Sequence, residues 1–384
     1  MTKTYAEQIH RCFRCGYCKF PNDFTDFNCP AYSRFRFESY STGGRLWLIW
    51  AWLKKEIDWS EHLAKVIFSC ATCRNCVQQC PMNFKNEIVD WIVAARSDMI
   101  EKGFALPKVR DFLNNISKHG NPWGMPRSKR DAWAEGIKRY RPGDEYLFYV
   151  GCVGSYEERG QRMARNLAEL LDGAEVSFGI LGVEENCDGN EVYMLGETGL
   201  FQELAEKNTQ KFKELKVRKV VALSPHAYNS IKNKYPRSGV FEVFHYTQLL
   251  SEIIREGKVR LSELKYKVTY HDPCFLGRYN EVYDAPREIL KSIPGIEVVE
   301  MKRTRENSFC CGGGSGNIVM DLLGGSTESP SRIRVREAYE TGAEILAVAC
   351  PSCMATLDDA VKDEGLEGKI TVKDIAELVQ ESAK

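Results

Sequence analysis

The sequence predicts an α+β protein of several domains, in which a helical N-terminal part precedes two tandem α/β modules. Two observations predict this arrangement. Eight of the fifteen cysteines lie before residue 81, in a region whose apolar residues recur at helical spacing. From residue 146 onward, short β-like runs alternate with amphipathic runs, and this alternation occurs twice with cysteines at matching places.

The N-terminal part is expected to span residues 1–105. Apolar residues at helical spacing predict a helix after residue 81 that ends near Gly103, and they are Ile88, Ile92, Ala95 and Met99. A second helix is expected over residues 47–59. The stretch 106–145 is rich in charged residues, Pro and Gly, and we predict that it is a linker.

The two modules are expected to span residues 146–258 and 259–384. In the first module, strands are expected over 146–150, 176–178 and 220–223, with helices over 162–171 and 200–215. In the second, strands are expected over 268–270, 296–299 and 345–349, with helices over 284–293 and up to Gly342.

The modules are related by an internal repeat. Cys152 and Cys187 are 35 residues apart, and Cys274 and Cys310 are 36 apart. Cys187-Asp188-Gly189 matches Cys310-Cys311-Gly312, and Ser224-Pro225-His226-Ala227 matches Cys350-Pro351-Ser352-Cys353. The second module therefore has five cysteines at these places, whereas the first has two.

Composition excludes some classes of function. Lys+Arg and Asp+Glu are both 53, and this balance predicts no nucleic-acid partner. The longest apolar run has eight residues, 46–53, whereas a helix needs about 20 to cross a bilayer. The first residues lack the apolar core of a signal peptide. We expect a cytoplasmic protein that reaches the inner face of a membrane only through a partner.

The N-terminal cysteines form two runs with the spacing of iron–sulfur ligands. Each run has three cysteines with two residues between successive ones, and a later Cys-Pro: Cys12, Cys15, Cys18 and Cys29, then Cys70, Cys73, Cys76 and Cys80. Disulfides would need an oxidising compartment, and zinc usually takes paired cysteines, so both alternatives fit less well. In two-cluster ferredoxins the fourth cysteine serves the other cluster. One set would then be Cys12, Cys15, Cys18 and Cys80, and the other Cys70, Cys73, Cys76 and Cys29.

On these motifs the chain resembles the heterodisulfide reductase iron–sulfur subunit family, and it is similar to the fused D-type subunit. The resemblance covers nearly the whole chain, including His271-Asp272-Pro273-Cys274, the Cys310-Cys311-Gly312 turn and Cys350-Pro351-Ser352-Cys353. It implies a ferredoxin-like domain with two cubane [4Fe–4S] clusters, followed by two cysteine-rich (CCG) modules. It also implies a non-cubane [4Fe–4S] cluster in the second module, on Cys274, Cys310, Cys311, Cys350 and Cys353. A zinc site or a reactive dithiol there is the alternative.

The first module departs from that pattern because most of its ligand positions are substituted. Cys152, Cys187, Asp188 and His226 could together hold zinc or a small cluster. The alternative is a degenerate module retained as structure, or as part of a pocket for a substrate or partner. In the second module, His271 and Asp272 could donate protons to a thiolate product, or could hydrogen-bond the end of a strand.

The resemblance implies an iron–sulfur electron-transfer subunit that acts on a disulfide or thiol. The loss of ligands in the first module leaves open a relay without catalysis, serving a flavin-linked hydroxyacid oxidase, an electron-transfer flavoprotein or a membrane cytochrome b and quinone complex. A zinc-stapled scaffold is a third interpretation. We expect a hetero-oligomer with redox subunits of the flavoprotein, cytochrome b or hydrogenase type, and the sequence does not decide whether this chain is itself an enzyme.

Overall fold

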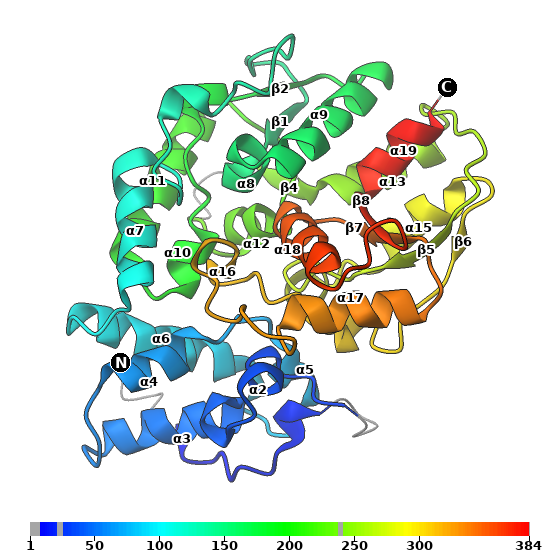
Figure 1. The fold of residues 1–384 in the computed structure, drawn as a ribbon. Helices are drawn as coiled ribbons and strands as arrows, with labels where there is room; N and C mark the ends of the chain where they lie inside the picture. The colour runs from blue at the N-terminus through cyan, green and yellow to red at the C-terminus, as the bar shows by residue number, and fades with distance from the viewer. Residues whose placement is uncertain (1–7, 21–25, 237–240, 384) are drawn as a thin grey trace.

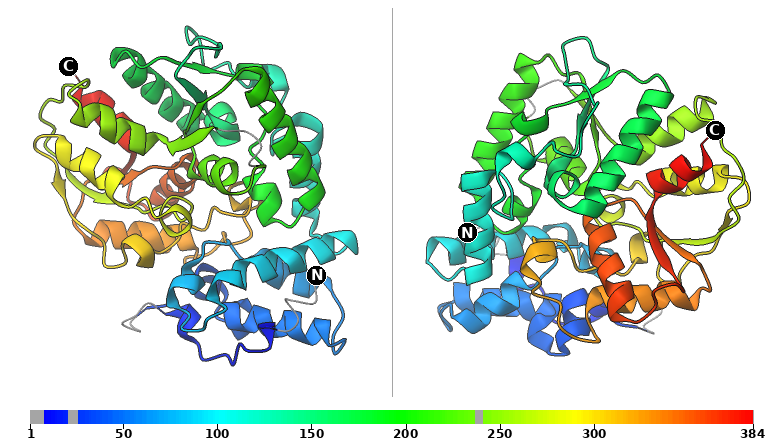
Figure 2. Two further views of the ribbon diagram at one scale, coloured as in Figure 1. Left: turned by 180° about the vertical axis from the view of Figure 1, so that it is seen from behind. Right: turned by 45° about the horizontal axis from the view of Figure 1, so that its top comes forward.

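The computed structural model describes residues 8–20, 26–236 and 241–383. Figure 1 shows a helical N-terminal part below two α/β modules that stand side by side. The two further views in Figure 2 show the same N-terminal part against one end of the pair of modules. The predicted α+β fold with several domains is confirmed.

The N-terminal part is built from short helices. Ser41 caps α3 (Thr42–Leu53), because its side chain accepts a hydrogen bond from the Gly44 amide. The helix expected over 47–59 is therefore shifted toward the N-terminus: it begins at Thr42 and ends at Leu53, and Lys55 takes a left-handed backbone (φ 61°). The remaining elements are η1 (Tyr17–Lys19), α2 (Pro30–Phe35), η2 (Glu38–Tyr40), α4 (Glu61–Phe68), α5 (Asn75–Gln79), η3 (Lys85–Glu87) and α6 (Ile88–Glu101).

The stretch expected to be a linker contains helix α7 (Pro107–His119) and the short η4 (Arg127–Lys129). Pro107 occupies the first position of α7, where its missing N–H costs nothing, and Gly120 ends the helix with φ 72°. Val109, Phe112 and Ile116 are buried on one face. The charged residues belong to the opposite, solvated face of an amphipathic helix. The high content of charged residues therefore led to the wrong prediction of a linker without a helix.

The first module contains a four-stranded parallel sheet in the order β2-β1-β3-β4. Tyr146 of the central strand β1 is in register with Phe178 on one side and Lys219 on the other. The strands are β1 (Tyr146–Tyr149), β2 (Phe178–Ile180), β3 (Lys219–Ala222) and β4 (Glu242–His245). The helices are α8 (Gly151–Tyr156), α9 (Glu158–Gly173), η5 (Gly182–Glu184), α10 (Asn190–Met194), α11 (Thr198–Glu214), α12 (Pro225–Asn233) and α13 (Tyr246–Arg255).

The second module repeats this topology, with a parallel sheet in the order β6-β5-β7-β8. Its strands are β5 (Lys267–Tyr270), β6 (Glu297–Val298), β7 (Ile345–Val348) and β8 (Thr371–Asp374). Its helices are α14 (Gly277–Asn280), α15 (Asp284–Ser292), η6 (Arg305–Asn307), α16 (Asn317–Met320), α17 (Pro330–Glu340), α18 (Pro351–Asp363) and α19 (Ile375–Ser382). The equivalent strand orders bear out the internal repeat.

Helices join the two modules: α9 packs against α18 and α19, and α13 packs against α15. The buried Arg96 of α6 joins all three parts of the chain. Its guanidinium donates to the carbonyl oxygens of Cys70 (2.5 Å) and Met194 (2.6 Å) and to Ser315 Oγ (3.0 Å). Within the described part of the chain, no helix is both long and apolar enough to cross a membrane.

Candidate metal centres

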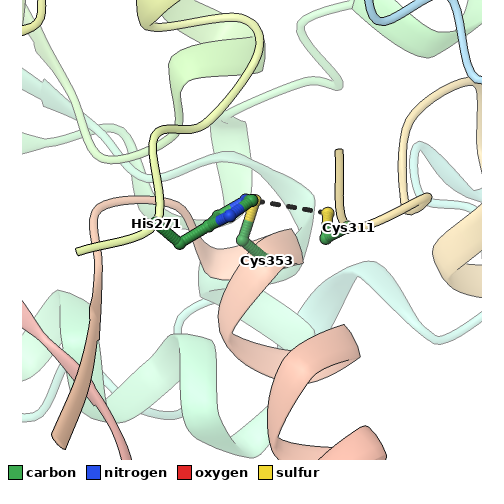
Figure 3. Close-up of side chains that lie close together, drawn as sticks. All are labelled: His271, Cys311 and Cys353. Atoms are coloured by element: carbon green, nitrogen blue, oxygen red, sulfur yellow. Dashed lines mark hydrogen bonds between the residues drawn. The ribbon is translucent and has the colours of Figure 1, made fainter. Parts of the chain in front are cut away.

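The five cysteines of the second module meet at one edge of its sheet. Cys274 follows β5 and Cys350 follows β7, and carboxyl ends of parallel strands lie at the same edge. Cys311 Sγ lies 3.5 Å from Cys353 Sγ, beside His271 (Figure 3). Hydrogen bonds between thiols continue this contact from Cys311 to Cys310 and Cys274, and from Cys353 to Cys350. The structure therefore brings all five predicted ligands together, and all five are buried.

Two of these thiols are readily ionised despite their burial. Burial opposes the ionisation of Cys350, but hydrogen bonds from Cys353 and His226 outweigh it and lower its pKa to about 5. Hydrogen bonds from Cys310 and Cys353, with a further one from His271, hold the pKa of Cys311 well below its usual value. Thiolates are the ligand form of cysteine and are soft donors, which suits iron–sulfur clusters and zinc.

The glycines after the cysteine doublet allow close packing against the N-terminal part. Gly312 has φ +90°, which favours glycine. A Cβ atom at Gly314 would lie 2.7 Å from the carbonyl oxygen of Ala71, inside the Cys70–Cys73 loop. The thiols of Cys73 and Cys310 are also close enough to hydrogen-bond, and this contact raises the pKa of Cys73. The glycine turn thus places the N-terminal cysteines beside those of the second module.

His271 and Asp272 have different surroundings. The Nδ1 atom of His271 lies 3.1 Å from Arg334 Nε, which can only donate, so Nδ1 accepts. A neutral His271 therefore has its proton on Nε2, from which it can hydrogen-bond Cys311. Asp272 instead forms a buried ion pair with Arg287 at 2.7 Å and accepts from the Arg305 amide at 2.8 Å. The carboxylate of Asp272 is thus engaged in holding the loop after β5.

The first N-terminal set surrounds a small cavity of about 20 Å³. Its wall includes the four cysteines that ferredoxin logic groups together, Cys12, Cys15, Cys18 and Cys80. In the second set, Cys29 is buried and interacts electrostatically with Cys73 and Cys70. Cys18 lines this cavity too; burial raises its pKa, and the nearby Cys76 and Cys29 of the second set raise it further. Cys29 is therefore beside the second run, which begins 41 positions later in the sequence, at Cys70.

The two cysteine runs share an unusual backbone conformation. Arg14 (φ 58°) and Gly16 (φ 89°) flank Cys15, and Thr72 (φ 48°) and Arg74 (φ 58°) flank Cys73. Each non-glycine residue in this left-handed region costs roughly 1–2 kcal/mol. Such strain is concentrated at functional sites, where it is part of the arrangement. Both loops thus curl in the same way around their central cysteine.

The four candidate metal ligands of the first module line one small cavity of about 50 Å³, but each of them has other partners. His226 Nδ1 lies 2.5 Å from Glu191 Oε1, and the ring also hydrogen-bonds Cys350 of the other module. Asp188 accepts a hydrogen bond from the Asn190 amide at 2.8 Å. Among all residues described by the structure, only His271, Cys311 and Cys353 offer three ligand atoms within 4.8 Å of one another.

Cys152 and Cys187 nevertheless lie in a distinctive environment. Both terminal guanidinium nitrogens of the buried Arg130, Nη1 and Nη2, lie 3.8 Å from Cys152 Sγ. A hydrogen bond from Cys187 and the charge of Arg130 lower the pKa of Cys152 although burial opposes them. Arg130 and Glu191 were missed by sequence reasoning, as was the buried Arg278 of α14, which donates to the Cys73 carbonyl oxygen. Their burial depends on elements far apart in the chain, so no local pattern marks them.

Comparison with known proteins agrees with this architecture. A 4Fe-4S dicluster domain model matches residues 8–84, and a cysteine-rich domain model matches residues 146–232 and 268–358. The D-type subunit of the dihydromethanophenazine:CoB–CoM heterodisulfide reductase of Methanosarcina mazei is 31% identical over 333 residues, covering 84% of this chain and 79% of the relative. The chain belongs to the D-type heterodisulfide reductase family. It is therefore an iron–sulfur electron-transfer protein that binds [4Fe–4S] clusters.

Other relatives of this D-type chain are longer. The probable iron-sulfur-binding oxidoreductase FadF of Bacillus subtilis is 41% identical over 333 residues, covering 82% of this chain and 46% of the relative. The EtfAB:quinone oxidoreductase of Syntrophomonas wolfei is 35% identical over 332 residues, covering 82% of this chain and 46% of the relative. The D-type chain thus spans about half the length of these two relatives.

A hypothetical protein from Helicobacter pylori has a similar fold, with a TM-score of 0.55 at 12% identity. The match covers 100% of this chain and 73% of the other.

Proposed function

We propose that this D-type chain carries electrons between a partner redox protein and a site that acts on a disulfide or thiol. Two cubane clusters would be held by the crossed sets, Cys12, Cys15, Cys18 and Cys80, and Cys70, Cys73, Cys76 and Cys29. A non-cubane cluster would be held by Cys274, Cys310, Cys311, Cys350 and Cys353. Such clusters supply one-electron transfer when bound.

The observation that carries this proposal is the contact between Cys73 and Cys310. It joins a ligand candidate of the N-terminal part to one of the second module, with no other domain between them. Arg278 supports the contact, since its guanidinium donates to the carbonyl oxygens of Cys73 (2.6 Å) and Ser308 (2.7 Å). The donor set also fits clusters, because five buried thiols meet at one place and two of them ionise readily.

The residues around the five cysteines have separate proposed roles. His271 donates from Nε2 to Cys311 and is the candidate proton donor to a thiolate product. Arg334 fixes the orientation of the ring by donating to Nδ1. Asp272 positions His271 through its ion pair with Arg287 and does not itself deliver a proton.

A second candidate function is a relay without disulfide chemistry. The relatives named as an EtfAB:quinone oxidoreductase and as a probable membrane-anchored ferredoxin favour it. So does the first module, in which only two of the five cysteines of the second module have a counterpart, Cys152 and Cys187. In this role a flavoprotein and a membrane-bound quinone or cytochrome b protein would be the partners in a hetero-oligomer, and the chain would reach the membrane through them.

The experiment that tests the proposal measures iron and acid-labile sulfide per chain anaerobically, with EPR before and after addition of a thiol. Two cubanes and one non-cubane cluster predict about 12 irons. Cys311→Ala should remove about four irons and the thiol-sensitive signal, whereas the matched Cys152→Ala should keep the iron. Unchanged iron and signals in Cys311→Ala would contradict the ligand assignment. Electron exchange with a flavoprotein, without reduction of any disulfide, would favour the relay.

A further inference from the structure

The first module places two thiols on one cavity at the boundary between the modules. Cys152 begins helix α8 after β1, and Cys187 lies in the loop before α10. Both line a cavity of about 50 Å³. Gly313 and Ser352, which neighbour the five-cysteine site, line the same cavity from the second module. The two thiols therefore face the region next to the proposed cluster without being among its ligands.

Cys152 lies beside a fixed positive charge. Arg130 is held by a buried ion pair with Glu185 (2.8 Å) and by donation to the carbonyl oxygens of Asn186 (3.1 Å) and Gly120 (3.3 Å). The other contacts of Glu185 are the amides of Val150 and Gly151, both at 2.9 Å. A guanidinium held from several sides stays within 3.8 Å of Cys152 Sγ and favours its thiolate.

Cys187 has the complementary property. Its thiol hydrogen-bonds Cys152, and its Sγ accepts from the Gly189 amide at 3.5 Å. The contact that lowers the pKa of Cys152 raises that of Cys187. Because the guanidinium of Arg130 lies beside the Cys152 sulfur, Cys152 is the thiol suited to attack, and Cys187 lies next to it to resolve the mixed disulfide. This asymmetry is what a thiol–disulfide exchange site requires.

The cavity adjoins a route from solvent. A polar cleft of about 660 Å³ lies between the modules, and its wall includes Arg159, Thr356 and Ile318. Ile318 also lines the cavity that contains the two thiols. The cleft and the cavity are therefore neighbours that share Ile318 in their walls.

We propose that Cys152 and Cys187 form a redox-active dithiol that exchanges with disulfides entering from this cleft. This dithiol goes beyond the proposed function. It rests on that function only for the electrons that would reduce the Cys152–Cys187 disulfide back to the dithiol. It gives the module that lost its cluster ligands a two-electron site of its own.

The reaction balances as thiol–disulfide exchange. The Cys152 thiolate attacks one sulfur of a disulfide RSSR, forming a mixed disulfide and releasing RS⁻. Cys187 then loses its proton and attacks the Cys152 sulfur, releasing the second RS⁻ and forming the Cys152–Cys187 disulfide. The dithiol loses two electrons and the substrate disulfide gains them. The proton of Cys187 ends on one released thiolate, and the other released thiolate takes its proton from solvent.

The test uses the cluster-containing chain, equilibrated anaerobically in buffers of reduced and oxidised dithiothreitol. After acid quenching and denaturation, free thiols are alkylated and the peptides are analysed by mass spectrometry. We expect a Cys152–Cys187 disulfide whose fraction follows the dithiothreitol ratio as a two-electron couple. Cys187→Ser should instead retain a mixed disulfide on Cys152 when treated with an aromatic disulfide such as 5,5′-dithiobis(2-nitrobenzoate). Arg130→Lys should keep the charge and much of the Cys152 reactivity, whereas Arg130→Gln should slow alkylation at neutral pH by about tenfold or more.

Two results would overturn the proposal. The first is that Cys152 and Cys187 remain two separately alkylated thiols at every dithiothreitol ratio. The second is stoichiometric zinc that is lost in Cys152→Ser but retained in Cys311→Ala. EPR of the same samples reports the clusters independently. If the Cys152–Cys187 disulfide follows the dithiothreitol ratio but the thiol-sensitive cluster signal is absent, only the proposed function is contradicted. If that cluster signal is present but the disulfide does not form, only the dithiol proposal is contradicted.

Discussion

The Nε–H of Arg278 donates a 2.6 Å hydrogen bond to the carbonyl oxygen of Cys73. Arg278 belongs to α14 of the second module, and Cys73 belongs to a cysteine run of the N-terminal part. Both are buried. This bond fixes the position at which the thiols of Cys73 and Cys310 meet, so the proposed electron route depends on one arginine that ligates nothing.

Removal of this arginine should loosen the junction. Arg278→Ala leaves the carbonyl oxygens of Cys73 and Ser308 without their donor, and each unsatisfied buried group costs about 1–3 kcal/mol. We expect a lower midpoint of urea unfolding and loss of magnetic interaction between clusters in EPR. Arg278→Lys, the matched control, keeps the charge but not the forked geometry and should be intermediate. Wild-type unfolding and spectra in Arg278→Ala would show that the junction is held elsewhere.

The crossed ligand sets make a pairwise prediction. Cys29→Ser and Cys70→Ser should perturb the same EPR signal, because Cys29 lies beside Cys70 and Cys73. Cys80→Ser and Cys12→Ser should both perturb the other signal, because their thiols share one cavity. Redox-titrated EPR of the four variants provides the measurement. A Cys29→Ser spectrum that matches Cys12→Ser would mean that each run serves its own cluster.

His226 should tune the potential of the cluster in the neighbouring module. Its ring hydrogen-bonds Cys350 while Glu191 holds Nδ1 at 2.5 Å. A donor to a ligand sulfur stabilises the reduced, more negative cluster. His226→Leu should therefore lower the reduction potential; a loss of about 1 kcal/mol corresponds to roughly 40 mV for one electron. His245→Leu is a control, since His245 is buried in the same module and hydrogen-bonds Thr247 instead. Equal potentials in His226→Leu and wild type would exclude this role.

Asp374 should make stability depend on pH. Burial raises its pKa from 3.8 to about 8, although it accepts a 2.6 Å hydrogen bond from Tyr246. The folded state therefore binds this proton more tightly than the unfolded state. The stabilisation is complete below pH 4 and is lost as pH rises toward 8, at no more than about 1.4 kcal/mol per pH unit.

Asp374→Asn tests this dependence with little change in shape, because asparagine can also cap α19 through the Ala376 amide. We expect the variant to melt at a higher temperature than wild type at pH 8, and to lose this component of the pH dependence between pH 5 and 8. Anaerobic thermal melts across this range provide the measurement. An unchanged pH profile would show that Asp374 is already ionised in the folded protein.

The predicted elements were mostly those with a strong local pattern. The strands beginning at Tyr146 and Ile345 are buried at every position, so they stand out as continuous apolar runs. The edge strands β4 and β8 were missed. Each pairs on one side only and includes exposed residues, such as Glu242 and Thr371, so their sequences do not stand out from loops.

The sequence by itself determined the chemistry and the repeat, because cysteine spacing is local and thiolates select few metals. It determined the family for the same reason, since the cysteine turns are short local motifs. Only the tertiary structure decided that Cys73 meets Cys310, that His226 turns to Glu191 and Cys350, and that Arg130 lies on Cys152. These contacts join residues tens to hundreds of positions apart, and a buried charge has no periodicity that would reveal its partner. They follow from how two parallel sheets and a helical domain pack together, and this packing is a property of the whole chain.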